Sequence, residues 1–428
     1  MARFLLSTLP AAGCVAHAQV LAAALVSRGH EVVWHTGGER AELVASVGAR
    51  FEPFREAASY EDLPPVADAG ERGFTAVNTM MRRLVVDRAA GQLADYRRIL
   101  ARFPADVVIS DGHCLGARLL HELGGPPWAV LNESALVGAC PDDPPFATGR
   151  VPTRVAERMR NRAVNWTMRR VMLHPLSKAY RELRRGVGLS EGGGTAFDAL
   201  RSPFLHLQPT SPAFEYPRRH LPPQIHLIGP MVPPQPPGFR PPAWWHELRQ
   251  APSVVHVTQG TTATRTSDLV GPAIEALAGH DGLVVVTVAG AEPPPGLPDN
   301  VRFSRYIPYQ ALLPHVDVMV TNAGYSGVHL ALANGVPMVA AGTQGDHREI
   351  CARIEWSGVG VWLRQSRPDR IAAAVARVLD DPAYRNNARR IQRDFARQDA
   401  GRNAAALLER LAATGKPVLG CRVRSHHD

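Results

Sequence analysis

The chain has 428 residues, of which 45% are hydrophobic and 20% are charged, and this balance is typical of a globular protein and excludes a disordered chain. No stretch of the sequence approaches the roughly 20 apolar residues that a membrane-spanning helix needs, and five scattered cysteines argue against a disulfide framework or a paired-cysteine zinc site. The net charge of +9 indicates an anionic partner, which could be a nucleotide-sugar, a phospholipid surface or a nucleic acid.

The amino-terminal residues follow a strand, loop, helix and strand pattern. The predicted elements are a buried strand "RFLLSTL" at 3–9, a loop "PAAGCVA" at 10–16, a helix "HAQVLAAALVSR" at 17–28 and a strand "EVVWHT" at 31–36. A secretory signal or a lipoprotein box matches poorly, because Arg3 is the only basic residue at the start and Pro10 ends the apolar run early. We therefore expect a βαβ unit that opens a cytoplasmic protein.

Apolar strands alternate with helices in two separate parts of the chain. The alternation restarts at "SVVHVTQG", residues 253–260, after the proline-rich stretch "EYPRRHLPPQIHLIGPMVPPQPPGFRPP". Proline at this density is typical of a stiff linker, and the alternation predicts parallel sheets with ligands at the carboxyl ends of their strands. We expect an N-terminal domain at 1–214, a linker at 215–243 and a C-terminal domain at 244–384. Closing helices at 385–413 and a disordered basic tail at 414–428 follow.

The stretch from Arg150 to about residue 185 is helical in pattern and rich in arginine. Its apolar residues fall at helical spacing with arginines between them: Val155, Met159, Ala163, Trp166 and Leu173. This pattern favours an amphipathic helix pair with a solvated basic face. The alternative is a docking surface for an anionic lipid or for an acceptor, which would give the chain a peripheral membrane contact.

Two long stretches resemble a known family. "SRGHEVVWHTG" is similar to the first helix end and second strand, and residues 297–363 to the donor-binding signature, of the UDP-glucuronosyl/glucosyltransferase superfamily, the family 1 glycosyltransferases. The bacterial natural-product and macrolide branch is the most similar. The resemblance implies the α/β GT-B fold, in which an N-terminal acceptor-binding and a C-terminal donor-binding Rossmann-like domain face a central cleft. It also implies inverting transfer of a sugar from UDP or dTDP to a small-molecule acceptor, with no cofactor and no metal.

The resemblance assigns a donor site to the C-terminal half. Backbone N–H groups at the start of a helix hold the diphosphate, an aromatic ring stacks on the base, and an acidic-polar pair contacts the sugar hydroxyls. The matching residues here are Gly260, Thr261, Tyr306, Ile307, Asn322, Gly324, Tyr325, Ser326, Gly327, Asp346 and His347. Three positions depart from the family: Asn322 replaces a histidine, Gly327 and Val328 replace serine or threonine, and Leu330 replaces a glutamate.

The sequence offers several candidates for the catalytic base. In the family a first-loop histidine, oriented by an aspartate after a later strand, removes the acceptor proton. Here Cys14 stands at the histidine position and Asp111 matches the aspartate. His17, one turn after Cys14, has the pKa range of a base, and His113 is a weaker substitute. An acceptor that is already nucleophilic would need little base catalysis.

The sequence is also compatible with other functions. The altered positions 14, 322 and 330 favour a non-catalytic relative that binds or activates a partner, and an epimerase acting on the nucleotide-sugar would use the same fold. A nucleic-acid binder is disfavoured, because the arginine-rich helices lack interleaved aromatic residues. The sequence is compatible with a monomer and with a homodimer.

Overall fold

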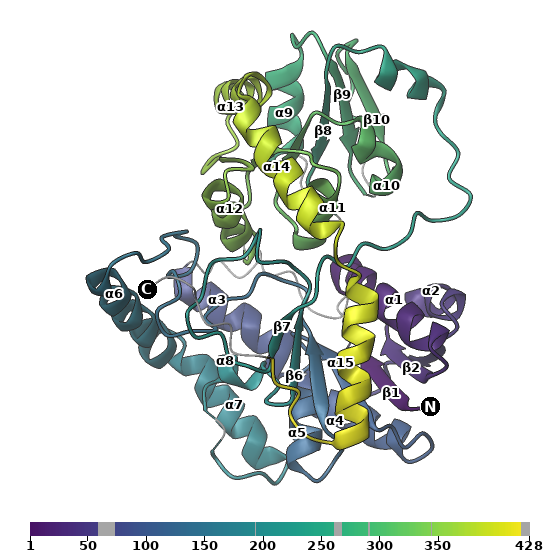
Figure 1. Cartoon of the computed structure of the whole chain (residues 1–428), viewed down its shortest axis with the longest axis vertical. Helices are drawn as coiled ribbons and strands as arrows, with labels where there is room; N and C mark the ends of the chain where they lie inside the picture. The colour runs from purple at the N-terminus through teal and green to yellow at the C-terminus, as the bar shows by residue number, and fades with distance from the viewer. Residues whose placement is uncertain (59–72, 193, 261–267, 290–291, 344, 421–428) are drawn as a thin grey trace.

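The computed structural model describes residues 1–58, 73–192, 194–260, 268–289, 292–343 and 345–420. Two parallel sheets, each covered by helices on both faces, lie one above the other in Figure 1. The predicted fold class, an α/β protein with two Rossmann-like domains, is therefore confirmed.

The first sheet has seven parallel strands in the order β3-β2-β1-β4-β5-β6-β7. Their sequences are short runs rich in β-branched and other apolar residues, and the central strands are buried along their length because helices cover both faces. The bounds are β1 Arg3–Ser7, β2 Glu31–Thr36, β3 Arg50–Pro53, β4 Val107–Asp111, β5 Trp128–Leu131, β6 Leu205–Gln208 and β7 Ile225–Leu227.

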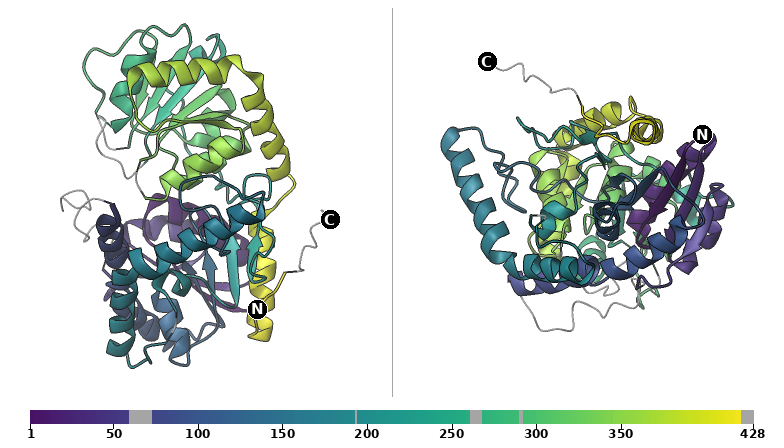
Figure 2. Two further views of the ribbon diagram at one scale, coloured as in Figure 1. Left: turned by 90° about the vertical axis from the view of Figure 1, so that its left-hand side faces the viewer. Right: turned by 90° about the horizontal axis from the view of Figure 1, so that it is seen from below.

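Within the described residues, eight α-helices before residue 200 and one at the carboxyl end accompany this sheet. Their bounds are α1 Ala12–Ser27, α2 Ala41–Ser46, α3 Gly73–Met81, α4 Ala89–Leu100, α5 Gly116–Glu122, α6 Val155–Thr167, α7 His174–Gly186, α8 Ala196–Ala199 and α15 Ala400–Thr414. One core joins α1, α2 and α15 to the sheet, and a second core on the opposite face contains α4, α5, α7 and α8. The last helix of the chain thus completes the core of the first domain (Figure 2, left).

The second sheet has six parallel strands in the order β10-β9-β8-β11-β12-β13. The strands are β8 Val254–Thr258, β9 Leu283–Thr287, β10 Val301–Ser304, β11 Val318–Thr321, β12 Met338–Ala340 and β13 Gly360–Trp362. The helices are α9 Val270–Leu277, α10 Tyr309–Leu312, α11 Tyr325–Ala333, α12 His347–Trp356, α13 Pro368–Asp380 and α14 Pro382–Phe395. Both sheets therefore order their strands around a central pair, which brings several strand ends together at one edge.

Three local predictions need correction. The first helix begins at Ala12, so Cys14 lies in its first turn and not in a loop. The proline-rich range 215–243 contains β7, which pairs with β6 and extends the first sheet. Part of the tail is ordered, because Val418 is buried and its N–H donates to the carbonyl of Phe204 at 2.8 Å. Residues 421–428 of the predicted tail lie outside the described residues.

The arginines of the arginine-rich helix are solvated as predicted, but most of its apolar residues are exposed as well, which the prediction of an amphipathic helix did not include. Of its apolar residues, Leu173 is buried, whereas Val155, Met159 and Trp166 are 71%, 59% and 62% exposed. The apolar side of α6 thus faces the solvent together with its arginines. Within the described residues, no helix combines the length and the apolar character that a bilayer crossing requires.

Candidate functional site

The carboxyl edges of the two sheets face each other. Each central strand there is followed by the first turn of a helix, α1 after β1 and α11 after β11. These two first turns are in contact, because Ser326 Oγ lies 3.3 Å from His17 Nε2 and 3.5 Å from the carbonyl oxygen of Gly13. The site is therefore built from residues about 310 positions apart in the sequence, one half from each domain.

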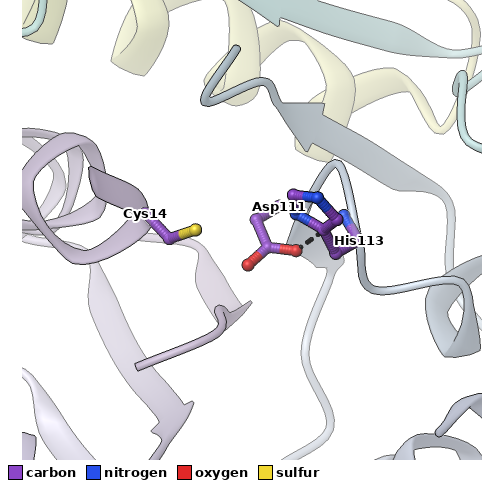
Figure 3. A group of neighbouring side chains, drawn as sticks. All are labelled: Cys14, Asp111 and His113. Carbon is purple, nitrogen blue, oxygen red and sulfur yellow. Dashed lines mark hydrogen bonds between the residues drawn. The ribbon is translucent and has the colours of Figure 1, made fainter. Parts of the chain in front are cut away.

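A compact polar cluster lies on the first-domain side. Cys14, Asp111 and His113 each place one side-chain ligand atom within 4.8 Å of the others (Figure 3). The Asp111 carboxylate is buried and accepts hydrogen bonds from the N–H groups of Leu9 at 2.6 Å and His113 at 2.9 Å. A thiol, a carboxylate and an imidazole could ligate a metal ion, but here both carboxylate oxygens already accept backbone hydrogen bonds.

Glu133 completes this cluster and was missed from the sequence. Its Oε1 lies 2.5 Å from Nδ1 of His113, and its Oε2 accepts a hydrogen bond from the N–H of Gly112 at 2.8 Å. Glu133 follows β5 just as Asp111 ends the neighbouring strand β4, so both reach the same edge of the sheet. The rule that polar residues after parallel strands gather at one edge could have identified it in "PWAVLNES".

The protonation states of Cys14 and His113 follow from burial and from these carboxylates. Burial, then Glu133 and Asp111, raises the pKa of the Cys14 thiol well above its usual value, so the thiol is protonated at neutral pH. Burial opposes the charged form of His113, but Glu133 and then Asp111 outweigh it and raise the His113 pKa to about 9. At neutral pH the cluster therefore holds an uncharged thiol and an imidazolium.

The raised pKa of His113 predicts a pH dependence of stability. Between the usual histidine pKa of about 6.5 and about 9 the folded protein binds the proton more tightly than the unfolded chain, so this stabilisation is present below pH 6.5 and is lost as pH rises through 9. We expect His113→Gln to be less stable than the parent at pH 6 and close to it above pH 9, measured by urea unfolding. A constant difference across that range would contradict the assignment.

His17 does not lie beside Asp111. Its side chain is 1% exposed, its Nε2 faces Ser326 in the second domain, and its ring packs edge-on against Tyr325 with centroids 6.0 Å apart. Burial, and then His329, lowers its pKa to about 3, so the ring is neutral at neutral pH. Among the described residues, His17 Nδ1 has no hydrogen-bond partner. The structure thus places His17 at the contact between the domains.

The first turn of α11 supplies unpaired backbone amides. The first hydrogen bond of this helix joins Val328 N–H to the carbonyl of Gly324 at 3.0 Å, which leaves the N–H groups of Tyr325, Ser326 and Gly327 without a partner in the described chain. Ala323 immediately before it has a φ of 64°, the left-handed conformation that turns the chain from β11 into the helix. Amides at a helix start are suited to binding an anion.

Two side chains of this loop have structural partners. The Tyr325 hydroxyl accepts a hydrogen bond from Gln208 at 2.8 Å and so points into the first domain. The Asn322 amide donates to the carbonyl of Gln259 at 2.5 Å and thereby holds the Gly260 loop. Gly260 itself has a φ of 76°, whereas Thr261 lies outside the described residues. The side chains of Asn322 and Tyr325 therefore hold the loop in shape, and a ligand bound there would contact backbone N–H groups.

The residues predicted to contact the nucleotide base and the sugar of the donor differ in solvent exposure. Tyr306 is 65% exposed at the end of β10, and the next residue, Ile307, is 1% exposed and anchors the segment in the core. An open tyrosine ring on an anchored backbone is suited to stacking. Asp346, at the start of α12, accepts a hydrogen bond from Ser134 of the first domain, and the neighbouring His347 is half-buried. Asp346 thus joins the cluster around His113, and Tyr306 lies on a separate strand end.

Comparison with known proteins supports a relation over almost the whole chain. Residues 272–411 match the family described as "Erythromycin biosynthesis protein CIII-like, C-terminal domain". The chain is 41% identical over 418 residues to 4'-demethylrebeccamycin synthase of Lentzea aerocolonigenes, covering 96% of this chain and 99% of that protein. It is 32% identical to UDP-glucosyltransferase 1 of Beauveria bassiana, covering 86% of each chain. The spinosyn rhamnosyltransferase SpnG, solved with thymidine diphosphate, has a similar fold with a TM-score of 0.69 and 19% identity, over 96% of this chain and 99% of that one.

Proposed function

This chain belongs to the family 1 glycosyltransferases, and from that membership and the site geometry we propose that it transfers a sugar from UDP or dTDP to a small natural-product acceptor with inversion at the anomeric carbon. The observation that carries the proposal is the opposition of two half-sites. The free amides of α11 and the open ring of Tyr306 lie on one sheet edge, and the buried Asp111 cluster lies on the other.

The two half-sites suit the two ends of a displacement reaction. The acceptor oxygen or nitrogen forms a bond to the anomeric carbon as the bond from that carbon to the diphosphate oxygen breaks. The leaving nucleoside diphosphate takes the electron pair, and the amides of Tyr325, Ser326 and Gly327 with the helix dipole stabilise its charge in place of a metal ion. The acceptor proton passes to the Asp111 side of the site. The proposal gives Asp346, whose Oδ2 accepts a hydrogen bond from Ser134, the role of accepting further hydrogen bonds from sugar hydroxyls.

We assign the proton-accepting role to the Asp111 carboxylate. Cys14 occupies the position of the family base, but its thiol is protonated at neutral pH. His113 is already an imidazolium at neutral pH, and neutral His17 faces Ser326. In this assignment the positive charge of His113 attracts the carboxylates of Glu133 and Asp111 and holds them in place.

Replacing Cys14 by alanine tests this assignment. We expect kcat to change by less than about threefold, because a protonated thiol contributes neither a base nor a charge. We also expect iodoacetamide to leave the activity intact, since Cys14 is 5% exposed and not a thiolate. A loss of about 100-fold or more, of the size seen when a general base is removed, would identify the thiol as the base. Cys351, which is buried in the second domain, provides a matched alanine control.

Nucleotide binding can be tested without knowledge of the acceptor. Calorimetric titration with UDP, dTDP, GDP and ADP is expected to show preferential binding of UDP or dTDP. Tyr306→Ala should weaken that binding by about 1–3 kcal/mol, the value of one aromatic stacking contact, and Tyr306→Phe should not. Equal binding by the alanine and phenylalanine variants would show that Tyr306 does not stack on the nucleotide base. If the protein bound no nucleotide, the non-catalytic alternative would be favoured.

The non-catalytic alternative rests on two observations. The thiol of Cys14 cannot act as a base at neutral pH, and the Asn322 amide is used within the protein. A binding or partner-activating protein would retain the nucleotide site without turnover. Release of nucleoside diphosphate only when an acceptor is present would exclude this alternative and the epimerase as well.

A further inference from the structure

Helix α6 has its polar and apolar sides reversed relative to the body of the protein. Its inner side is attached through two asparagines. Asn161 is fully buried and donates to the carbonyl of Asp142 at 3.3 Å, and Asn165 donates to the carbonyls of Pro141 at 3.0 Å and Asp143 at 2.9 Å. The large apolar residues are on the side turned to the solvent. A helix that is attached to its domain by side-chain amides and exposes its apolar stripe is suited to contact an apolar surface outside the domain.

The exposed side has the pattern of an interfacial helix. At about 100° per residue, Val155, Met159 and Trp166 fall in one narrow stripe. Arg158 and Arg162 flank the stripe on one side, whereas Arg160 lies farther round the helix and donates to Asn161. Long arginine side chains can bury their methylene groups beside apolar residues while their charges reach a polar layer. We call this stripe and its flanking arginines the α6 outer face.

A recess beside the α6 outer face could hold an anionic headgroup. Its volume is 230 Å³, and its lining includes Arg158, Arg162, Arg219 and His220, with Asp142 at its wall. Neither the Arg162 nor the Arg219 guanidinium makes a hydrogen bond or ion pair within the part of the chain that the structure describes. Two guanidinium groups without a direct partner beside an apolar stripe favour an anion attached to an apolar body, which is the chemistry of an anionic phospholipid.

We propose that the α6 outer face docks this protein on an anionic lipid bilayer. Figure 1 shows α6 at the edge of the first domain, away from α1 and α15, and the right view of Figure 2 shows the same dark teal helix at the periphery, so a flat surface can reach it. The π-helix Met168–Met172, which directly follows α6, adds the exposed Arg170 and the 59% exposed Val171 to this part of the surface. A second copy of the chain is a poorer occupant, because two copies of this face would place arginines against arginines.

Co-sedimentation of the full chain with vesicles tests the proposal. At low salt we expect binding to vesicles of equal parts phosphatidylglycerol and phosphatidylcholine, little binding to phosphatidylcholine alone, and release by added salt. Arg162→Glu and Trp166→Ala should each weaken binding by about tenfold, the first through lost charge and the second through lost apolar contact. Arg390→Glu, the same charge change at an exposed position of α14, is the matched control and should bind like the parent.

A lipid contact also has a direct readout at Trp166. Vesicles containing brominated phosphatidylcholine should quench the tryptophan fluorescence of the parent protein more than that of Trp166→Phe, because that ring would lie among the acyl chains. Equal quenching, or equal sedimentation of Arg162→Glu and the control, would overturn the proposal. Two other results would also overturn it. If the parent were a dimer and Trp166→Ala a monomer, the face would belong to a second copy of the chain. If Trp166→Ala raised the KM for the acceptor in the absence of vesicles, the face would belong to the acceptor site.

Discussion

We expect the replacement of Asp111 by asparagine to lower kcat by about 10²- to 10⁴-fold, the range for losing a positioned acid or base, and to leave nucleotide affinity unchanged. The carboxylate is 2% exposed and is held by the N–H groups of Leu9 and His113. Asparagine keeps the shape but removes the charge that we propose accepts the proton, and its amide nitrogen cannot accept a hydrogen bond from either N–H. The measurements are steady-state kinetics with the acceptor and calorimetry with the nucleoside diphosphate.

Asp106→Asn is the control for this prediction. Asp106 also accepts a backbone hydrogen bond from the strand-β1 segment, from Arg3 N–H at 2.7 Å, but it lies at the amino end of β4, away from the site. We expect its kcat to equal that of the parent. If both variants lost the same activity, the Asp111 effect would reflect damage to the sheet. If neither lost activity, the acceptor would need no base, and the proton-accepting role of Asp111 would be wrong.

We expect the replacement of Arg353 by methionine to lower the free energy of unfolding by about 3–5 kcal/mol, the cost of removing one partner from a buried ion pair. Arg353, on α12 of the second domain, is 1% exposed. It contacts Glu215 of the first domain at 2.7 Å and Glu349 at 2.6 Å, and it donates to the carbonyl of Leu136 at 2.8 Å. Methionine fills much of the same space but leaves two buried carboxylates with less compensation. Urea unfolding, followed by tryptophan fluorescence, measures the loss.

The matched control for Arg353 is Arg364→Met. Arg364 pairs with Glu355 at 3.2 Å, and both side chains are at least half exposed, so we expect a loss of about 0–1 kcal/mol. The pH dependence gives a second check. Burial opposes ionisation of Glu215, but Arg353 and then Arg218 outweigh it and lower its pKa. This stabilisation is present above the usual glutamate pKa of about 4.3 and is lost as pH falls below it. A variant with the same acid sensitivity as the parent, or as stable as Arg364→Met, would contradict the role of Arg353.

Much of the fold follows from local patterns. The β-branched runs at β4, β9 and β11 are buried on both faces, so their sequences are apolar throughout and identify them as central strands of parallel sheets. The site was also partly accessible, because the carboxyl ends of such strands converge. That rule locates Asp111 and the start of α11, and it would have located Glu133 and Ser134 after β5 had it been applied there.

Contacts between distant segments could not be predicted in this way. Nothing local indicates that His17 faces Ser326, that Arg353 pairs with Glu215, or that α15 completes the core of the first domain. The same holds for α6, where helical spacing identifies an apolar stripe but not the side from which the domain contacts it. The sequence by itself determined the two α/β domains, the family and the residues available for the site, because hydrophobic periodicity and motifs are properties of neighbouring residues. Only the tertiary structure decided which titratable groups are buried together, and therefore their charge, because burial and Coulomb interactions depend on distances in space that the chain order does not contain.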